Sequence, residues 1–397
     1  MNVVVYVSDA LRADHLGCYG ARFVSTPTVD DLAGGGVRFD QAISAAAWTA
    51  PSMTSMVTGL YAHHHGYLHW DAEVDPSVET LFGAFARHGY EVGTFVFDRN
   101  YLFKDLPEAN VLGTSETLDG ALAWLREVRD RPFFLFFHNW ATHMPYDILH
   151  SQRKDWLAAK KEVIEGIQAD SASALEATRE AYRKAVERQS EVLVASLLEE
   201  LERLDLRERT ALAFLSDHGE SWGERFADKQ DVKGVYHMHG ATLADEIVQV
   251  PLILSAPERL DPGVVSTQVR SVDLAPTLIQ LAGAPALQAD GESLLPLVEG
   301  VEQGDRPAIL TGTDTGALTK LAVRMPPWKL ILDAESGEEV AYRLDVDPRE
   351  LDPLPADDVP GELRELLYRE LESAVRHELT EEEEAVVTQR LADLGYI

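Results

Sequence analysis

Short apolar runs recur along the chain and alternate with helical segments. The runs are VVVYV (residues 3–7), VGTFVF (92–97), FFLFF (133–137), ALAFL (211–215) and VPLIL (250–254). Within each run the apolar residues are continuous and do not alternate with polar ones, as in parallel strands that are covered on both faces. The pattern therefore predicts an α/β fold with a doubly wound, mostly parallel sheet.

Two longer segments favour helices. Residues from about 150 to 205 are rich in Ala, Glu, Lys and Arg, and we interpret their charges as a solvated helix face. DLAPTLIQLAG (273–283) has the pattern of an amphipathic helix. The three glycines at 34–36 lack the spacing of a dinucleotide-binding loop and predict a turn that ends a helix.

The character of the sequence changes after residue 303. AILTG (308–312), KLAVRM (320–325) and WKLILD (328–333) favour strands, and a Pro/Asp-rich loop and a charged helical region follow them. We expect a main domain over residues 1–303 and a smaller α+β subdomain over 304–397, with an antiparallel sheet and a helix.

The composition indicates a soluble globular protein. Hydrophobic residues make up 45% and charged residues 26% of the 397 residues, and no apolar run approaches the roughly 18 residues of a membrane span. The first strand starts at residue 2 without a basic segment or cleavage signal, so we expect no standard export signal and a cytoplasmic location. The single cysteine, Cys18, cannot form an internal disulfide, which is consistent with a reducing compartment.

The chain is strongly acidic, with 35 basic and 67 acidic residues and a net charge of −32. This charge argues against nucleic acid as a partner. Its self-repulsion is tolerated when salt screens it, so we hypothesise a halophilic source. The alternative is an ordinary acidic cytoplasmic enzyme.

Side chains that can bind a metal ion follow three of the apolar runs. Asp9 follows the first run, His138 and Asn139 follow the third, and Asp217 and His218 follow the fourth. Ligands of open α/β sheets bind beyond the carboxyl ends of the strands, so we expect these side chains to meet at one edge, although such residues also end strands for turn reasons alone. The two carboxylates and the imidazole of Asp9, Asp217 and His218 suit Ca²⁺, Mg²⁺ or Mn²⁺, and Zn²⁺ also accepts them.

The segment APSMTSMVTG (50–59) predicts a helix that has proline in its first turn and glycine after its end. Thr49 then lies at or before the helix N-terminus. From spacing alone, the simpler interpretation is an N-cap. The second interpretation is a nucleophile, because the helix N-terminus attracts an anionic group and a bound metal helps to deprotonate the alcohol.

In their order and spacing, seven segments resemble the sulfatase branch of the alkaline phosphatase superfamily. They are VSDALRADHLGCYG (7–20), TPTVDDLAGGGVRFDQA (26–42), PSMTSMVTGLYAHHHG (51–66), HMPYD (143–147), FLSDHGE (214–220), VDLAPTLIQLAGAP (272–285) and YRLDVDPRE (342–350). The resemblance implies an alkaline-phosphatase-like fold with catalysis in the main domain. It also implies that Asp9, Asp217 and His218 bind a divalent metal ion and that Thr49 occupies the nucleophile position, in contact with that ion.

The chain departs from the sulfatase pattern at the nucleophile. Most sulfatases have a cysteine or serine there, which is oxidised to formylglycine, and an arginine follows Pro-Ser. This chain has Thr49 and Met53 at these positions, and Ala10 replaces the second residue of the usual Asp-Asp pair. Threonine cannot form that aldehyde because its carbinol carbon bears a methyl group, so we expect no formylglycine. Superfamily members with a nucleophilic threonine act on phospho groups, which leaves sulfate and phosphate esters both open.

Other departures concern substrate and metal binding. The lysine and histidine that hold sulfate are missing after GYEV, and Arg99 and Asn100 lie nearby instead. The Asp-x-x-x-His element of two-metal relatives reads Asn139 to His143, which favours a single metal ion. His239 resembles a position that contacts the substrate or a second metal in relatives.

These comparisons predict a role for each candidate residue. We expect Thr49, His143 and His239 to be catalytic, and Arg12, Arg99, Asn100 and Lys233 to bind the substrate. Arg12 has two alternatives, orienting Asp9 or lying on the surface of a helix. AHHHG (His63 to His65) could indicate a metal cluster, but adjacent histidines at a helix end point in different directions and cannot all bind one ion. We therefore expect a loop after the helix, with only His65 near the site.

The leading hypothesis is a metal-dependent hydrolase of small anionic phosphate or sulfate esters that forms a covalent intermediate on Thr49. One alternative is a transferase or mutase, which moves the phospho group to a second alcohol. Another alternative is a non-catalytic metal-binding homologue that has kept the fold. The sequence leaves the oligomeric state open.

Overall fold

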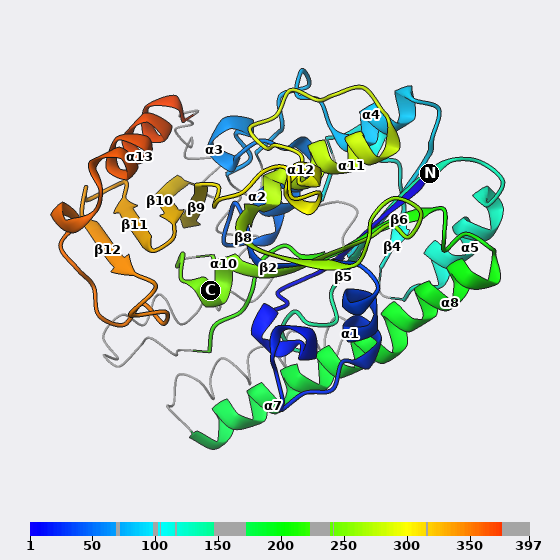
Figure 1. Ribbon diagram of the computed structural model, residues 1–397, viewed down its shortest axis with the longest axis horizontal. Coiled ribbons are helices and arrows are strands. Elements are labelled where there is room, and N and C mark those ends of the chain that lie inside the picture. Colours follow the sequence, from blue (N-terminus) through cyan, green and yellow to red (C-terminus); the bar gives the residue numbers. More distant parts are fainter. Residues whose placement is uncertain are drawn as a thin grey trace.

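The computed structural model describes residues 1–68, 72–97, 102–103, 105–115, 117–146, 172–222, 239–240, 242–314 and 317–374. Within these residues the chain forms an eight-stranded sheet between helices and a separate four-stranded sheet near the C-terminal end (Figure 1). The predicted α/β architecture with a smaller antiparallel sheet is therefore confirmed. The domain boundary at residue 303 stays a prediction.

The large sheet has the strand order β4-β3-β5-β1-β6-β7-β2-β8. Its strands are β1 (Asn2–Ser8), β2 (Val37–Ile43), β3 (Glu91–Val96), β4 (Val111–Thr114), β5 (Phe133–Asn139), β6 (Thr210–Ser216), β7 (Gln249–Ser255) and β8 (Gly263–Arg270). All five predicted apolar runs are strands, and three of them, β5, β1 and β6, lie side by side in parallel at the centre.

The sheet also differs from the sequence prediction in two respects. The predicted run at 250–254 forms β7, which pairs antiparallel with both β6 and β2, so the sheet is mostly parallel but not entirely so. The strands β2, β4 and β8 were not predicted. In β2 (VRFDQAI) polar residues interrupt the apolar ones, and the first residues of β8 are exposed, so neither resembles a strand that is buried on both faces.

Helices cover both faces of the large sheet. Alternate residues of the buried strands point to opposite faces, so each face is apolar and packs against helices. Val3, Val5 and Val7 belong to one apolar cluster, while Val4 and Tyr6 belong to a second one. The first face carries α2 (Thr49–Thr58), α4 (Leu81–Arg87), α11 (Leu274–Ala282) and α12 (Leu295–Val298); the second carries α1 (Pro27–Gly34), α5 (Asp119–Val128), α7 (Ala172–Arg188) and α8 (Ala195–Arg203) (Figure 1).

The helices predicted between about 150 and 205 are present, within the described residues, as one continuous helical stretch before the fourth apolar run. It consists of α7, a π-helical segment (Gln189–Val194) and α8, and the predicted residues from 150 to 171 lie outside the described part. The π-helical turn places the buried amide of Gln189 against the hydroxyl of Ser8, at the end of β1. The helix at 273–283 is confirmed as α11, and the glycines at 34–36 end α1 as expected.

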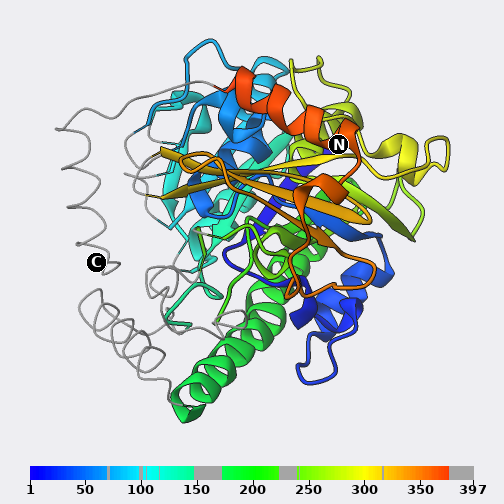
Figure 2. The ribbon, with the colours of Figure 1, turned by 90° about the vertical axis from the view of Figure 1, so that its left-hand side faces the viewer.

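The small sheet has the order β12-β11-β10-β9 and is antiparallel throughout its pairs. Its strands are β9 (Ala308–Asp314), β10 (Ala317–Met325), β11 (Trp328–Asp333) and β12 (Glu339–Arg343), and α13 (Gly361–Ser373) packs against it (Figure 2). A buried ion network holds this sheet to α10 (Asp245–Val248). Asp245 pairs with Arg324 at 2.8 Å and with Lys329 at 2.9 Å, and Lys329 also pairs with Glu350.

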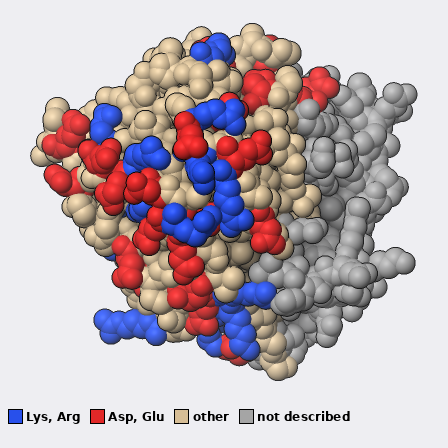
Figure 3. Space-filling model, turned by 90° about the vertical axis from the view of Figure 1, so that its right-hand side faces the viewer, with Lys and Arg blue, Asp and Glu red and all other residues tan. Residues whose placement is uncertain are grey.

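No helix among the described residues is long and apolar enough to cross a lipid bilayer. On the face seen in Figure 3, acidic and basic side chains are interspersed over the described surface. The acidic block TEEEEA (380–385) lies outside the described residues.

Candidate active site

The ends of the three central strands lie level with one another. The register pairs Ser8 at the end of β1 with Asn139 of β5 on one side and with Ser216 of β6 on the other. The residues that follow these strands, Asp9 and Asp217, therefore emerge together at the carboxyl edge of the sheet. This is the edge at which α/β sheets bind ligands.

Asp9, Asp217 and His218 form a compact buried group at this edge, as the sequence predicted. Their ligand atoms all lie within 4.8 Å of one another, and all three residues are buried. Nε2 of His218 is 3.7 Å from Oδ1 of Asp9 and 3.4 Å from Oδ2 of Asp217. One imidazole nitrogen and two carboxylate oxygens therefore surround a common point.

The donor atoms of this group fit a divalent cation. Oδ1 of Asp9 and Oδ2 of Asp217 are buried and have no hydrogen-bond partner. His218 donates its Nδ1–H to the carbonyl oxygen of Gly219 at 2.8 Å, which leaves the lone pair of Nε2 directed toward the carboxylates. Burial, reinforced by the charge of Asp217, raises the pKa of Asp9 well above its usual value. Two buried carboxylates with unpaired oxygens need a positive charge between them.

Thr49 lies beside this group. Its Oγ1 is 3.2 Å from Nε2 of His218. Thr49 is the first residue of α2, and the N-cap position is taken by Trp48, whose side chain makes no capping bond. The simpler interpretation of Thr49 as an N-cap is therefore wrong, because its hydroxyl points to His218 and not to the amides of its own helix. The predicted end of the helix is correct, since Gly59 terminates α2 with φ 73°.

Two serines attach the first turn of α2 to the end of β6. Ser52 donates its hydroxyl to the carbonyl oxygen of Asp217 at 2.7 Å, and Ser44 donates to the same oxygen. The two hydroxyls are also 2.9 Å apart. All of these groups are buried, so the distance between the helix N-terminus and the carboxylates is held by a dry hydrogen-bond network.

His138, which the sequence placed among the metal-capable side chains at this edge without a specific role, contacts Asp9 directly. Its Nε2–H donates to Oδ2 of Asp9 at 2.9 Å, while its Nδ1 is buried without a partner. Burial lowers the pKa of His138 to about 4, so the ring is neutral at pH 7. The sequence feature that points to His138 as a site residue is its position directly after the apolar run FFLFF. The neighbouring Asn139 uses its side-chain oxygen to accept from the amide of Ala141.

The predicted catalytic histidines also lie at this edge. The ring of His239 packs on His218 with a centroid distance of 4.2 Å, and the ring of His143 meets that of His239 at 5.3 Å. His239 donates Nδ1–H to Glu220 at 3.0 Å, and His143 donates Nδ1–H to the carbonyl oxygen of Met144 at 2.8 Å. Glu220 is a second residue without a predicted role, although it closes the quoted FLSDHGE segment.

Arg12 is buried, so its interpretation as a surface residue is wrong. Its guanidinium pairs with Asp14 at 2.7 Å, donates to the carbonyl oxygen of Glu220 at 3.0 Å and lies over the ring of Trp222. These contacts place Arg12 next to the Glu220 that holds His239. The other predicted substrate-binding residues, Arg99, Asn100 and Lys233, lie outside the described residues.

The histidines of AHHHG form the one-turn helix α3 (Ala62–His65), so the predicted loop is wrong. Nε2 of His65 is 3.0 Å from the hydroxyl of Ser55 in α2, so His65 packs against this helix. His63 and His64 instead approach Glu370 of α13.

Comparisons with known proteins agree with this architecture. Residues 1–284 match the family described as Sulfatase, and residues 238–377 match the family described as N-sulphoglucosamine sulphohydrolase, C-terminal. The chain is 26% identical over 315 residues to an ulvan-active sulfatase of Formosa agariphila, covering 75% of this chain but only 58% of that relative. It is 23% identical over 430 residues to arylsulfatase K of Rattus norvegicus, covering 88% and 74% of the two chains.

Solved structures share the fold over almost their whole length. A phosphonate monoester hydrolase of Agrobacterium radiobacter has a TM-score of 0.70 at 21% identity, covering 96% of this chain and 98% of that one. A putative sulfatase from Bacteroides thetaiotaomicron has a TM-score of 0.75 at 18% identity, covering 96% of each chain. The alkaline-phosphatase-like fold implied by the seven segments is thus confirmed. With the family match extending over more than half of its residues, this chain belongs to the sulfatase family.

Proposed function

We propose that this protein is a metal-dependent hydrolase of sulfate or phosphate esters and that Thr49 is its nucleophile. The observation that carries the proposal is the distance of 3.2 Å between Oγ1 of Thr49 and Nε2 of His218. It places an alcohol at the edge of a group whose unpaired oxygens suit a cation. We assign catalysis to residues 1–303 and treat residues 304–397 as the C-terminal subdomain.

Asp9, Asp217 and His218 would hold one divalent metal ion, with Thr49 beside it. A ligand set with two carboxylates favours Ca²⁺, Mg²⁺ or Mn²⁺, and Zn²⁺ also accepts it. When bound, such an ion lowers the pKa of a neighbouring alcohol and neutralises charge on the ester.

The proposed reaction proceeds in two displacements. Oγ1 of Thr49 passes its proton to solvent and attacks the sulfur or phosphorus atom, and the bond to the leaving alcohol breaks as the bond to Thr49 forms. Water then attacks the same atom as the bond to Thr49 breaks, and a proton of that water ends on the released Thr49 oxygen. The N-terminus of α2 points its free amides at the anionic group during both steps. Losing one donor of this kind typically costs on the order of 100-fold in rate.

The two histidines next to His218 supply protons and positive charge in this proposal. Glu220 accepts from Nδ1 of His239, which fixes the orientation of that ring. We assign to His239 the transfer of a proton to the leaving alcohol, and to His143 a contact with the charged oxygens. Arg99, Asn100 and Lys233 remain proposed contacts to the substrate.

We further propose that Thr49 acts without conversion to formylglycine. The methyl group on its carbinol carbon prevents oxidation to that aldehyde. An intact-mass measurement of the purified protein tests this point, because the proposal requires the mass calculated from the unmodified sequence. A mass lower than calculated for the peptide that contains residue 49 would contradict the proposal.

The nature of the ester is best tested with a panel of four aryl probes: a sulfate, a phosphate monoester, a phosphate diester and a phosphonate. The names of the relatives favour the sulfate and the phosphonate. Added glycerol or sugar tests the alternative of a transferase, which would yield a phosphorylated or sulfated acceptor instead of free anion. Failure of all four probes with every metal ion would favour the non-catalytic homologue.

Two variants of Thr49 test the nucleophile itself. Thr49→Val keeps the volume and removes the oxygen, and we expect it to lower kcat at least about 10³-fold. Thr49→Ser keeps a hydroxyl and should retain more activity than Thr49→Val. Turnover by Thr49→Val at the rate of the unaltered protein would remove Thr49 from the mechanism.

A further inference from the structure

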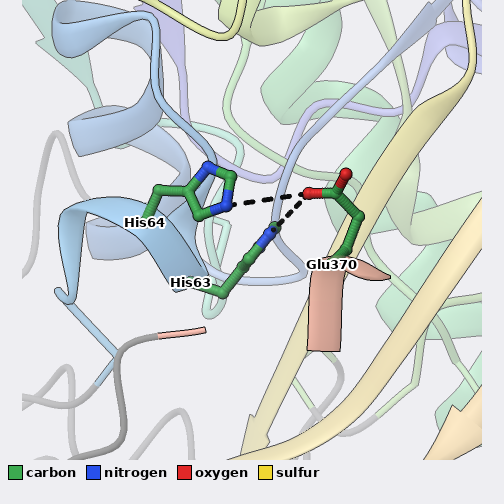
Figure 4. A group of neighbouring side chains, drawn as sticks. All are labelled: His63, His64 and Glu370. Carbon is green, nitrogen blue, oxygen red and sulfur yellow. Dashed lines mark hydrogen bonds and ion pairs between the residues drawn. The ribbon is translucent and has the colours of Figure 1, made fainter. Parts of the chain in front are cut away.

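A second group of metal-capable side chains lies between α3 and α13. Nε2 of His63 is 3.2 Å from Oε2 of Glu370, and Nε2 of His64 is 3.7 Å from the same oxygen. The three ligand atoms lie within 4.8 Å of one another. Figure 4 shows both imidazoles directed toward the same oxygen of the Glu370 carboxylate. The group joins residues that are 307 positions apart in the sequence.

The distances match those between ligands of a tetrahedral zinc ion. With bonds of about 2.0–2.2 Å, two ligand atoms on such an ion are separated by about 3.3 Å. The two nitrogen–oxygen distances, 3.2 and 3.7 Å, bracket this value. All three ligand atoms lie within 4.8 Å of one another, so an adjustment of these side chains would bring them to one ion.

A carboxylate behind His64 orients its ring for metal binding. Nδ1–H of His64 donates to Oδ2 of Asp290 at 2.8 Å, and the same oxygen accepts from the backbone amide of Tyr61. Metal-bound histidines usually donate their other N–H to a carboxylate, a backbone carbonyl or water. The bond directs Nε2 of His64 toward Glu370. The hydroxyl of Ser373 lies 2.9 Å from this nitrogen, and a metal ion would take over that contact.

We propose that His63, His64 and Glu370 form a second metal site, which binds Zn²⁺ or a similar transition-metal ion. Two imidazole nitrogens and one carboxylate oxygen are a typical zinc ligand set, whereas Ca²⁺ and Mg²⁺ prefer sites made of oxygen atoms. The two sites of this chain would therefore differ in their preferred metal. Solvent completes the fourth position, because the side chains of His64 and Glu370 are partly exposed.

Binding needs a change in the protonation of His63. This ring now donates Nε2–H to Glu370, and its Nδ1 is buried without a partner. When Nε2 binds the ion, the proton moves to Nδ1. An unpaired buried N–H is unfavourable. We therefore expect the affinity to be lower than that of a zinc site with four protein ligands.

The site would tie the C-terminal subdomain to the segment that leaves the nucleophile helix. α3 begins three residues after the glycine that ends α2, and Glu370 lies in the last turn of α13. An ion bound in the folded state but not in the unfolded chain raises the unfolding temperature. The expected role of the site is therefore structural, and it does not depend on whether Thr49 is the nucleophile.

The test uses the full chain in which Asp9→Asn and Asp217→Asn have removed the carboxylates of the first site. Zn²⁺ is titrated by calorimetry, and unfolding is followed with and without Zn²⁺. We expect one zinc ion per chain and a rise in the unfolding temperature. Glu370→Gln and His64→Gln should each weaken binding at least tenfold and abolish the rise.

His88→Gln is the matched control, because His88 is an exposed histidine at the end of α4 and should not affect zinc binding. Circular dichroism confirms that each variant is folded. The proposal is overturned if the folded background protein binds no Zn²⁺. It is equally overturned if Glu370→Gln and His64→Gln bind Zn²⁺ as tightly as the background protein.

Discussion

The hydroxyl of Thr49 and the ring of His218 meet at 3.2 Å, although the two residues are 169 positions apart in the sequence. One comes from the first turn of α2 and the other follows the end of β6. Serines 44 and 52 hold these two elements together through the carbonyl oxygen of Asp217. The contact is thus a fixed property of the fold, and the proposed chemistry depends on it.

Asp217→Asn should stabilise the metal-free protein and should remove the additional stabilisation that a bound metal ion gives. Oδ2 of Asp217 has no partner and lies near a second buried carboxylate, that of Asp9. An amide there removes one negative charge and adds a donor, so we expect a gain of about 1 kcal/mol in the free energy of unfolding without metal. Urea denaturation with and without Mn²⁺ or Ca²⁺ measures both effects. A variant with an unchanged metal response would exclude Asp217 as a ligand.

His138 should act as a positioning residue for Asp9. Its Nε2–H donates to Oδ2 of Asp9, and partners of this kind typically change metal affinity by about 10–100-fold. We expect His138→Ala to weaken metal binding by that factor without abolishing it. His138→Gln offers an amide donor and should recover part of the loss. Calorimetric titration compares the two variants, and equal affinities in both would contradict the role of the hydrogen bond.

The buried ion network around Asp245 should stabilise the contact between α10 and the small sheet. Asp245→Asn leaves the charges of Arg324 and Lys329 without this partner, and we expect a loss of about 3–5 kcal/mol in the free energy of unfolding. Urea denaturation at pH 7 measures this loss. Asp40→Asn, at a more exposed carboxylate paired with Arg38, is the control and should cost less than about 1 kcal/mol.

The same carboxylate predicts a pH dependence. Burial alone would raise the pKa of Asp245, but the charges of Lys329 and Arg324 outweigh burial and hold the pKa below its usual value. Its contribution to stability is therefore complete above the unfolded pKa of about 4 and is lost as the pH falls toward the folded value. We expect the free energy of unfolding to decrease more steeply from pH 6 to pH 3 in the unaltered protein than in the Asp245→Asn variant. Parallel curves would contradict the assignment.

The net charge of −32 predicts that salt stabilises the fold. At low ionic strength the excess of acidic side chains repels itself, and screening lowers this repulsion. We expect the unfolding temperature to rise from dilute buffer to molar KCl, and a halophilic source would make the rise large. Equal unfolding temperatures in the two buffers would refute the halophilic hypothesis.

Several features of the molecule could be derived from the sequence alone. The continuous apolar runs identify strands that are buried on both faces, and polar residues directly after them must emerge at the carboxyl edge of a parallel sheet. This reasoning located Asp9, Asp217 and His218 together. The proline and glycine around α2 located Thr49 at a helix N-terminus. In each case the determining information lies within a few residues of the feature.

Tertiary structure alone decided the features that join distant segments. The hydrogen bond from His138 to Asp9 depends on β5 lying next to β1, and the packing of His239 on His218 depends on how the chain returns to the edge of the sheet. The sequence of AHHHG predicted that the three rings point in different directions. His65 does point away from the other two, toward Ser55. Only the fold brings His63 and His64 to Glu370, because contacts of long sequence separation are set by packing and leave no local pattern in the chain.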